Sequence, residues 1–79
     1  MPTELYGTLS CPFTQEMREW LEWKRRAFTE YDVENDADAL NRMLAITGGQ
    51  RTVPVLVEDG QAVQIGWQGR GCVIHTPRS

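Results

Sequence analysis

The most constraining feature of the sequence is a hairpin signal in its second half. Residues 52–57 form a β-branched, apolar run that favours a buried strand. Asp59-Gly60 follows, a dipeptide typical of two-residue hairpin turns, and residues 61–65 supply the returning strand. Because proline lacks the backbone N–H that the middle of a strand requires, Pro54 must lie at the beginning of the first strand. The pattern therefore predicts a pair of antiparallel strands.

Strand and helix patterns alternate ahead of this hairpin. Apolar residues spaced by three or four, from Phe13 through Met17 and Leu21, predict a first helix. An Asn-Asp pair at 35–36 and a Gly-Gly pair at 48–49 are typical of the start and end of a second helix. The predicted elements in chain order are a strand over residues 3–7, a helix over 12–27, a strand over 28–33, the second helix and the hairpin. This β-α-β-α-β-β order predicts the α/β class, with helices packed against a mixed four-stranded sheet.

Length and composition exclude several classes of protein. A chain of 79 residues has room for one small domain, taken as residues 1–79. Its net charge of −3 argues against a nucleic-acid partner, because phosphate binding needs a basic surface. No apolar run approaches the roughly 20 residues of a membrane helix, and residues 1–4 do not resemble a signal peptide. We therefore expect a cytoplasmic protein with no membrane partner, and its oligomeric state is left open.

Cys11 is the residue that most strongly indicates a chemical function. It directly precedes Pro12 at the start of the predicted first helix, where unpaired backbone N–H groups and the helix dipole favour a thiolate. Thr14 lies three residues further on, and its hydroxyl can donate a hydrogen bond to that sulfur. The alternative is a buried structural cysteine. The succession of strand, Cys-Pro and helix favours the nucleophile.

The motifs resemble those of a glutaredoxin in order and spacing, over almost the whole chain. The matching residues are Tyr6, the Cys-Pro-Phe-Thr run at 11–14, residues 47–54, Asp59-Gly60 and Ile65-Gly66. The Gln-Arg-Thr-Val-Pro run at 50–54 is the most specific of them. The chain is most similar to short bacterial glutaredoxin-like proteins with cysteine or selenocysteine at the leading active-site position and no cysteine at the fourth. The resemblance implies a thioredoxin-like fold with a curtailed C-terminal helix.

The resemblance also implies a role for each matching residue. Cys11 would be the nucleophile of a thiol-disulfide oxidoreductase, with Pro54 in the cis form facing it. The backbone of Val53 would pair with the cysteinyl part of glutathione. Gln50 and Arg51 would lie near the glycine carboxylate of glutathione. The residues expected to bind substrate, which are the matching positions and their neighbours, are Tyr6, Pro12, Phe13, Gln50, Arg51, Thr52, Val53, Pro54, Gly66 and Trp67. Glutathione would be a co-substrate, no cofactor would stay bound, and the partners would be disulfide-containing proteins or low-molecular-weight thiols.

Two positions depart from the family pattern. Thr8 stands where most glutaredoxins have a lysine that assists thiolate formation and glutathione binding. A Gly-Trp-Gln-Gly run at 66–69 replaces a Gly-Gly-x-Asp pattern. The aspartate that would hold the glutamyl end of glutathione is therefore missing.

Thr14 occupies the position of a second active-site cysteine, which leaves two routes for disulfide exchange. In the monothiol route, the Cys11 thiolate takes glutathione or another thiol and is then reduced by a second small thiol. In the other route Cys72 resolves the intermediate, approaching on a glycine-rich segment at 66–71. The alternative reading of Cys72 is a buried apolar filler.

Functions without catalysis also stay open. The same fold can serve as a carrier or adaptor that binds an iron-sulfur cluster or a protein partner. Cys72 and His75 have Cys-x-x-His spacing, but with Cys11 they supply at most three ligands where a structural zinc takes four. We therefore expect no metal site.

Overall fold

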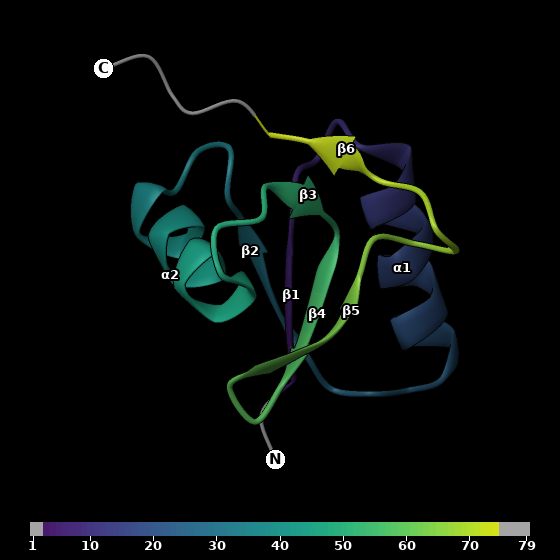
Figure 1. Cartoon of the computed structure of the whole chain (residues 1–79). Coiled ribbons are helices and arrows are strands. Elements are labelled where there is room, and N and C mark those ends of the chain that lie inside the picture. Colours follow the sequence, from purple (N-terminus) through teal and green to yellow (C-terminus); the bar gives the residue numbers. More distant parts are fainter. Residues whose placement is uncertain (1–2, 75–79) are drawn as a thin grey trace.

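A mixed four-stranded sheet forms the centre of the computed structural model, which describes residues 3–74 (Figure 1). The elements are β1 (Thr3–Gly7), α1 (Pro12–Trp23), β2 (Thr29–Asp32), α2 (Ala37–Thr47), β3 (Thr52–Val53), β4 (Val55–Glu58), β5 (Gln61–Ile65) and β6 (Cys72–Val73). The strand order is β2-β1-β4-β5, with β1 parallel to β2 and antiparallel to β4. The expected α/β class and mixed sheet are confirmed.

The first helix is shorter than its predicted range of 12–27. Lys24 ends α1, and Arg25 has a left-handed φ of 58° that turns the chain away from the helix axis. The buried face of α1 consists of Thr14, Met17 and Leu21, whereas Phe13 is only half-buried. The helix is thus rotated so that a threonine, rather than the first aromatic residue, faces the sheet.

The second helix begins and ends where its signals predicted. Asp36 is the N-cap, and its carboxylate accepts a hydrogen bond of 3.2 Å from the backbone N–H of Ala39. Gly48 ends the helix in a left-handed conformation, with φ of 75°, and its N–H donates to the carbonyl of Leu44. Local capping chemistry therefore defines both ends of α2.

Pro54 divides the strand that the sequence predicted over residues 52–57. The Val53–Pro54 peptide bond is cis, as the resemblance implied, and separates β3 from β4. β4 joins the large sheet and pairs with β5 through the Asp59-Gly60 turn, whose φ values of 56° and 76° are those of a primed hairpin turn. β3 instead pairs with β6 in a separate two-stranded sheet. The predicted hairpin is confirmed, but its first strand is split.

Two apolar clusters lie on the two faces of the large sheet, which α1 and α2 cover from opposite sides (Figure 1). On the α2 side, Tyr6, Val55 and Val57 pack with Met43; on the α1 side, the cluster is Leu5, Met17, Leu21 and Leu56. This alternation follows from the period of two in β1 and β4. The curtailed C-terminal helix is absent altogether from the described part of the chain, where residues 66–74 form a turn and β6.

Candidate redox site

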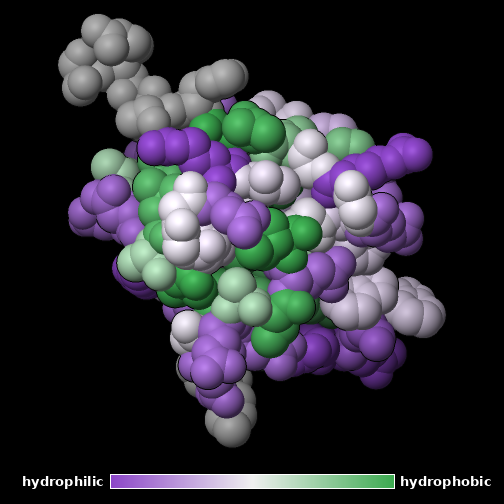
Figure 2. Space-filling view, viewed as in Figure 1, coloured by the Kyte–Doolittle hydropathy of each residue, from purple (hydrophilic) through white to green (hydrophobic). Residues whose placement is uncertain are grey.

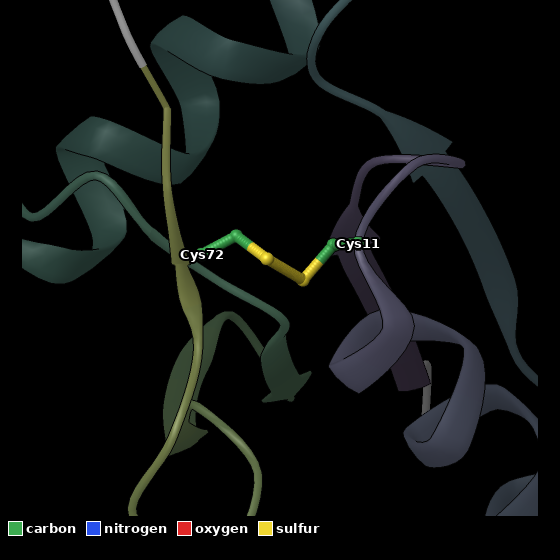
Figure 3. Close-up of a disulfide and its surroundings, with 2 residues drawn as sticks. All are labelled: Cys11 and Cys72. Carbon is green, nitrogen blue, oxygen red and sulfur yellow. A yellow bond between two sulfur atoms is a disulfide. The ribbon is translucent and has the colours of Figure 1, made fainter.

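Cys11 and Cys72 form a disulfide across one end of the molecule (Figure 3). The two residues are 61 positions apart in the sequence, and their Cα atoms are separated by 6.1 Å. Cys11 lies at the N-cap of α1 and Cys72 is the first residue of β6. The structure thus joins Cys72 to the predicted nucleophile, and Cys72 is half-buried against the α2-side cluster.

The backbone around Cys11 places its side chain at the N-terminus of α1. Cys11 is extended, with φ −89° and ψ 117°, and Pro12 occupies the first helical turn. The carbonyl of Cys11 accepts the first helical hydrogen bond, 3.2 Å long, from the N–H of Gln15. Because a helix N-terminus carries unpaired N–H groups, this position favours a negatively charged sulfur once the disulfide is reduced.

Thr14 is fully buried behind Cys11, against β1. A Cβ atom added to Gly7 would overlap the methyl group of Thr14 and lie 2.7 Å from its Oγ1 atom. The Oγ1 atom is buried and has no hydrogen-bond partner among residues 3–74. In the disulfide form this hydroxyl is therefore an unused donor, and its hydrogen bond to a reduced Cys11 stays a prediction.

β3 brings the predicted substrate-binding turn next to the disulfide. Val53 is buried and pairs in antiparallel register with Cys72, while Thr52 pairs with Val73. Pro54 is fully buried, and its carbonyl accepts a hydrogen bond of 2.7 Å from the N–H of Gly66. The predicted residues 52–54 and 66 thus meet Cys11 and Cys72 at the same end of the molecule.

Arg51 and Gln50 precede this turn and differ in their surroundings. The carbonyl of Arg51 accepts a hydrogen bond of 2.8 Å from the N–H of Ile74. Its Nη1 atom is buried, with no hydrogen-bond partner within the described range of 3–74. Gln50 is exposed, and its N–H donates to the Thr47 hydroxyl. The backbone of Arg51 thus pairs with Ile74, and its side chain carries a donor that is unused within residues 3–74.

Tyr6 lies in the core. Its ring is fully buried and stacks on Tyr31 with 5.0 Å between ring centroids, and its hydroxyl donates a hydrogen bond of 3.1 Å to Glu4. Burial, and next the neighbouring Glu4 carboxylate, raise the pKa of Tyr6 above its ordinary value. The phenol therefore stays protonated, and its contact with substrate stays a prediction.

The remaining predicted residues lie at the start of α1 or pack against it. Pro12 is exposed, and Phe13 packs half-buried against the α2-side cluster. Trp67 packs edge-on against Trp20, with 5.7 Å between centroids, and its indole N–H donates a hydrogen bond of 3.0 Å to Glu16. Trp67 therefore covers the α1 side of the sheet.

Two residues of the site were missed from the sequence. Ile74 is only 6% exposed and belongs to the α2-side cluster, which also contains Cys11 and Val53. Gly71 runs so close to β3 that an added Cβ atom would lie 2.5 Å from the carbonyl oxygen of Val53. No sequence pattern marks either residue, because each is placed by contacts with residues 51–53, about twenty positions earlier in the chain.

The described residues form neither a metal site nor a membrane-spanning helix. Residues 3–74 contain no group of three or more His, Cys, Asp or Glu side chains placed to hold a metal ion. His75, the third of the possible ligands named with Cys11 and Cys72, lies outside the described residues. Neither α1 nor α2, the helices of the described region, is long and apolar enough to cross a membrane.

The fold is that of a thioredoxin-like protein, and its two cysteines form a disulfide at the N-terminus of α1. The family model described as Glutaredoxin matches residues 3–63, and the chain belongs to the glutaredoxin family. Cys72 lies beyond the matched residues.

Individual relatives agree with this family. The probable glutaredoxin slr1562 of Synechocystis is 35% identical over 60 residues, which cover 76% of this chain and 55% of the relative. The match thus spans just over half the length of that curated relative. The crystal structure of the thioredoxin-like protein BC3987 has a TM-score of 0.75 and 35% identity, covering 84% of this chain and 88% of that one. The crystal structure of a BC3987 mutant has the same TM-score, and the match covers 82% of the mutant's chain.

Proposed function

We propose that this chain is a thiol-disulfide oxidoreductase that uses Cys11 and Cys72 as its redox couple. The observation that carries the proposal is the disulfide between the N-cap of α1 and β6. A cysteine at a helix N-terminus is suited to attack, and a second cysteine within bonding distance can complete the reaction. Cys72 thereby supplies the thiol that Thr14 cannot.

The reaction proceeds in two exchanges. The Cys11 thiolate attacks one sulfur of a target disulfide, the target S–S bond breaks, and the other target sulfur leaves as a thiolate. The Cys72 thiolate then attacks the Cys11 sulfur and releases the first target sulfur, also as a thiolate. Two electrons have passed from the Cys11–Cys72 pair to the target, and an external thiol reductant regenerates the pair.

Glutathione in the monothiol route is the second candidate, supported by Arg51. The buried Nη1 atom of Arg51, unpaired within residues 3–74, has the charge to hold a carboxylate such as that of glutathione. In this route glutathione would complete the cycle without Cys72. The two routes differ in whether Cys72 is required for turnover.

Alkylation of the reduced chain tests the role of Cys11. At neutral pH, iodoacetamide should modify Cys11 at least about tenfold faster than Cys72, because a helix N-terminus raises the thiolate fraction of its cysteine. Peptide mapping over time gives both rates, and the chain unfolded in urea is the control in which the two rates converge. Equal slow rates in the folded chain would argue against Cys11 as the nucleophile.

Thr14→Val tests the hydrogen bond predicted for the reduced state. The variant removes the hydroxyl and keeps the shape, so we expect Cys11 to be alkylated more slowly, by about tenfold or more, at neutral pH, as loss of one hydrogen bond to a charged group implies. The oxidised variant should be as stable as the parent or slightly more, since Thr14 Oγ1 has no partner there within residues 3–74. An unchanged pH profile of alkylation would show that Thr14 only fills space.

A further inference from the structure

β6 occupies the backbone edge of β3 to which a substrate was predicted to bind. Cys72 pairs with Val53 in antiparallel register, and Ile74 N–H donates to the carbonyl of Arg51. The sulfur of Cys72 is at the same time bonded to Cys11. Cys72 therefore occupies the position expected for the cysteine of a bound target. Its backbone pairs with Val53, and its sulfur is bonded to Cys11 (Figure 3).

The residue before Cys72 has no room for a side chain. A Cβ atom at Gly71 would lie 2.5 Å from the carbonyl oxygen of Val53 and 2.7 Å from the Cγ2 atom of Thr52. The φ of Gly71 is not left-handed, so close approach of the two backbones, rather than backbone conformation, requires glycine here. The edge of β3 therefore accepts only a glycine at this position of a paired strand.

The two residues after Cys72 point in opposite directions. Val73 is 66% exposed, whereas Ile74 is 6% exposed and packs in the α2-side cluster with Cys11 and Val53. Figure 2 shows hydrophobic surface at this end of the molecule, over β6 and beside the grey tail. The site thus contacts the second residue after the cysteine closely and leaves the first unconstrained.

We propose that residues 71–74 are an internal counterpart of the substrate. The site beneath them binds an extended segment of a target protein, with glycine before the cysteine, any residue after it and an aliphatic residue next. Glutathione has neither that glycine nor the aliphatic residue, so it is the poorer ligand. This inference rests on the proposed function, because the site is useful only if Cys11 reacts with the bound cysteine.

β6 and the target compete for the same edge of β3, so the attack of Cys72 on the mixed disulfide also drives release of the target. While the target is bonded to Cys11, its segment occupies the edge of β3 and β6 is displaced. When the Cys72 thiolate attacks the Cys11 sulfur, the Cys11–target bond breaks and the target leaves as a thiolate. Re-pairing of β6 with Val53 in the same step removes the edge to which the target was bound.

Peptide mixed disulfides test this specificity in the reduced Cys72→Ser chain, in which reaction stops after one exchange. Four capped peptides, Gly-Cys-Val-Ile, Val-Cys-Val-Ile, Gly-Cys-Val-Asp and Gly-Cys-Ala-Ile, each carry nitrothiobenzoate on the cysteine sulfur, as does glutathione. Attack by Cys11 on the cysteine sulfur releases coloured nitrothiobenzoate thiolate. Each rate is divided by the rate with mercaptoethanol, which corrects for intrinsic reactivity.

The first and last peptides should react alike and about tenfold or more faster than the other two and glutathione, the discrimination that one apolar contact or clash provides. Equal normalised rates, or a faster rate with glutathione, would overturn the specificity while leaving Cys11 as the nucleophile. No release from any mixed disulfide would instead remove the proposed function itself.

Gly71→Val in the same Cys72→Ser background supplies a second readout. Its added side chain should exclude β6 from β3, so the Gly-Cys-Val-Ile peptide should react severalfold faster than with Cys72→Ser alone. Val73→Ala is the matched control, because Val73 is exposed on the same strand and its truncation should change nothing. An unchanged or slower rate in the folded Gly71→Val chain, checked by circular dichroism, would contradict the competition.

Discussion

Cys11→Ser will lower the rate of disulfide exchange on the order of a thousandfold or more, the scale of effect seen when a nucleophile is removed. A serine hydroxyl is not ionised near neutral pH and cannot replace the thiolate at the N-cap of α1. The measurement is single-turnover reduction of a chromogenic mixed disulfide by the reduced chain. Retained exchange in Cys11→Ser would move the nucleophile to Cys72 and contradict the site.

Cys72→Ser is the matched control, since it removes the other sulfur of the same disulfide. Its first exchange should proceed at close to the parent rate, because Cys11 and α1 are intact. The target should then accumulate as a mixed disulfide on Cys11, which intact mass reveals. If Cys72→Ser turns over as fast as the parent with glutathione as reductant, the monothiol route is the correct one.

Gly7→Ala will destabilise the fold by about 3 kcal/mol, at the upper end of what overpacking costs. The added methyl group would overlap the buried side chain of Thr14, which α1 holds against the central strand β1. Neither element can shift freely, because β1 pairs on both sides, with β2 and β4. Urea denaturation of parent and variant under reducing conditions measures the difference in the free energy of unfolding.

Thr14→Ala supplies the control for this clash. Removing the methyl and hydroxyl groups of Thr14 leaves space for the alanine at position 7, so the double variant should be more stable than the sum of the two single effects predicts. The expected coupling is about 1–2 kcal/mol. Additive effects, or a cost of Gly7→Ala below roughly 0.5 kcal/mol, would contradict the close packing of α1 on β1.

Local chemistry is what made much of the fold predictable. Asp59-Gly60 and the Asp36 cap act within a few residues, so the hairpin and the start of α2 followed from sequence. The early end of α1 depends on the left-handed Arg25, a conformation that an arginine does not signal. The burial of Thr14 depends on a strand residue without a side chain, Gly7, which no helical periodicity reveals.

The candidate site, like the fold, could be predicted only where neighbouring residues determine it. Cys11 was identifiable because Cys-Pro between a strand and a helix has a specific chemical meaning. The partnership of Cys72 with Cys11 was left open because it depends on β6 reaching β3, about twenty residues earlier in the chain. Gly71 and Ile74 allow β6 to lie against β3. Each does so through contacts with residues distant in the sequence, which the spacing of residues along the chain does not indicate.

The most direct test of the Cys11–Cys72 couple is peptide-mapped intact mass after the reduced chain has equilibrated with oxidised glutathione. We predict the loss of two hydrogens, with Cys11 joined to Cys72 and no lasting glutathione adduct. A stable adduct on Cys11 beside a free Cys72 thiol would contradict the couple and establish the monothiol route. A chain whose two thiols both remain unreacted would contradict the redox function altogether.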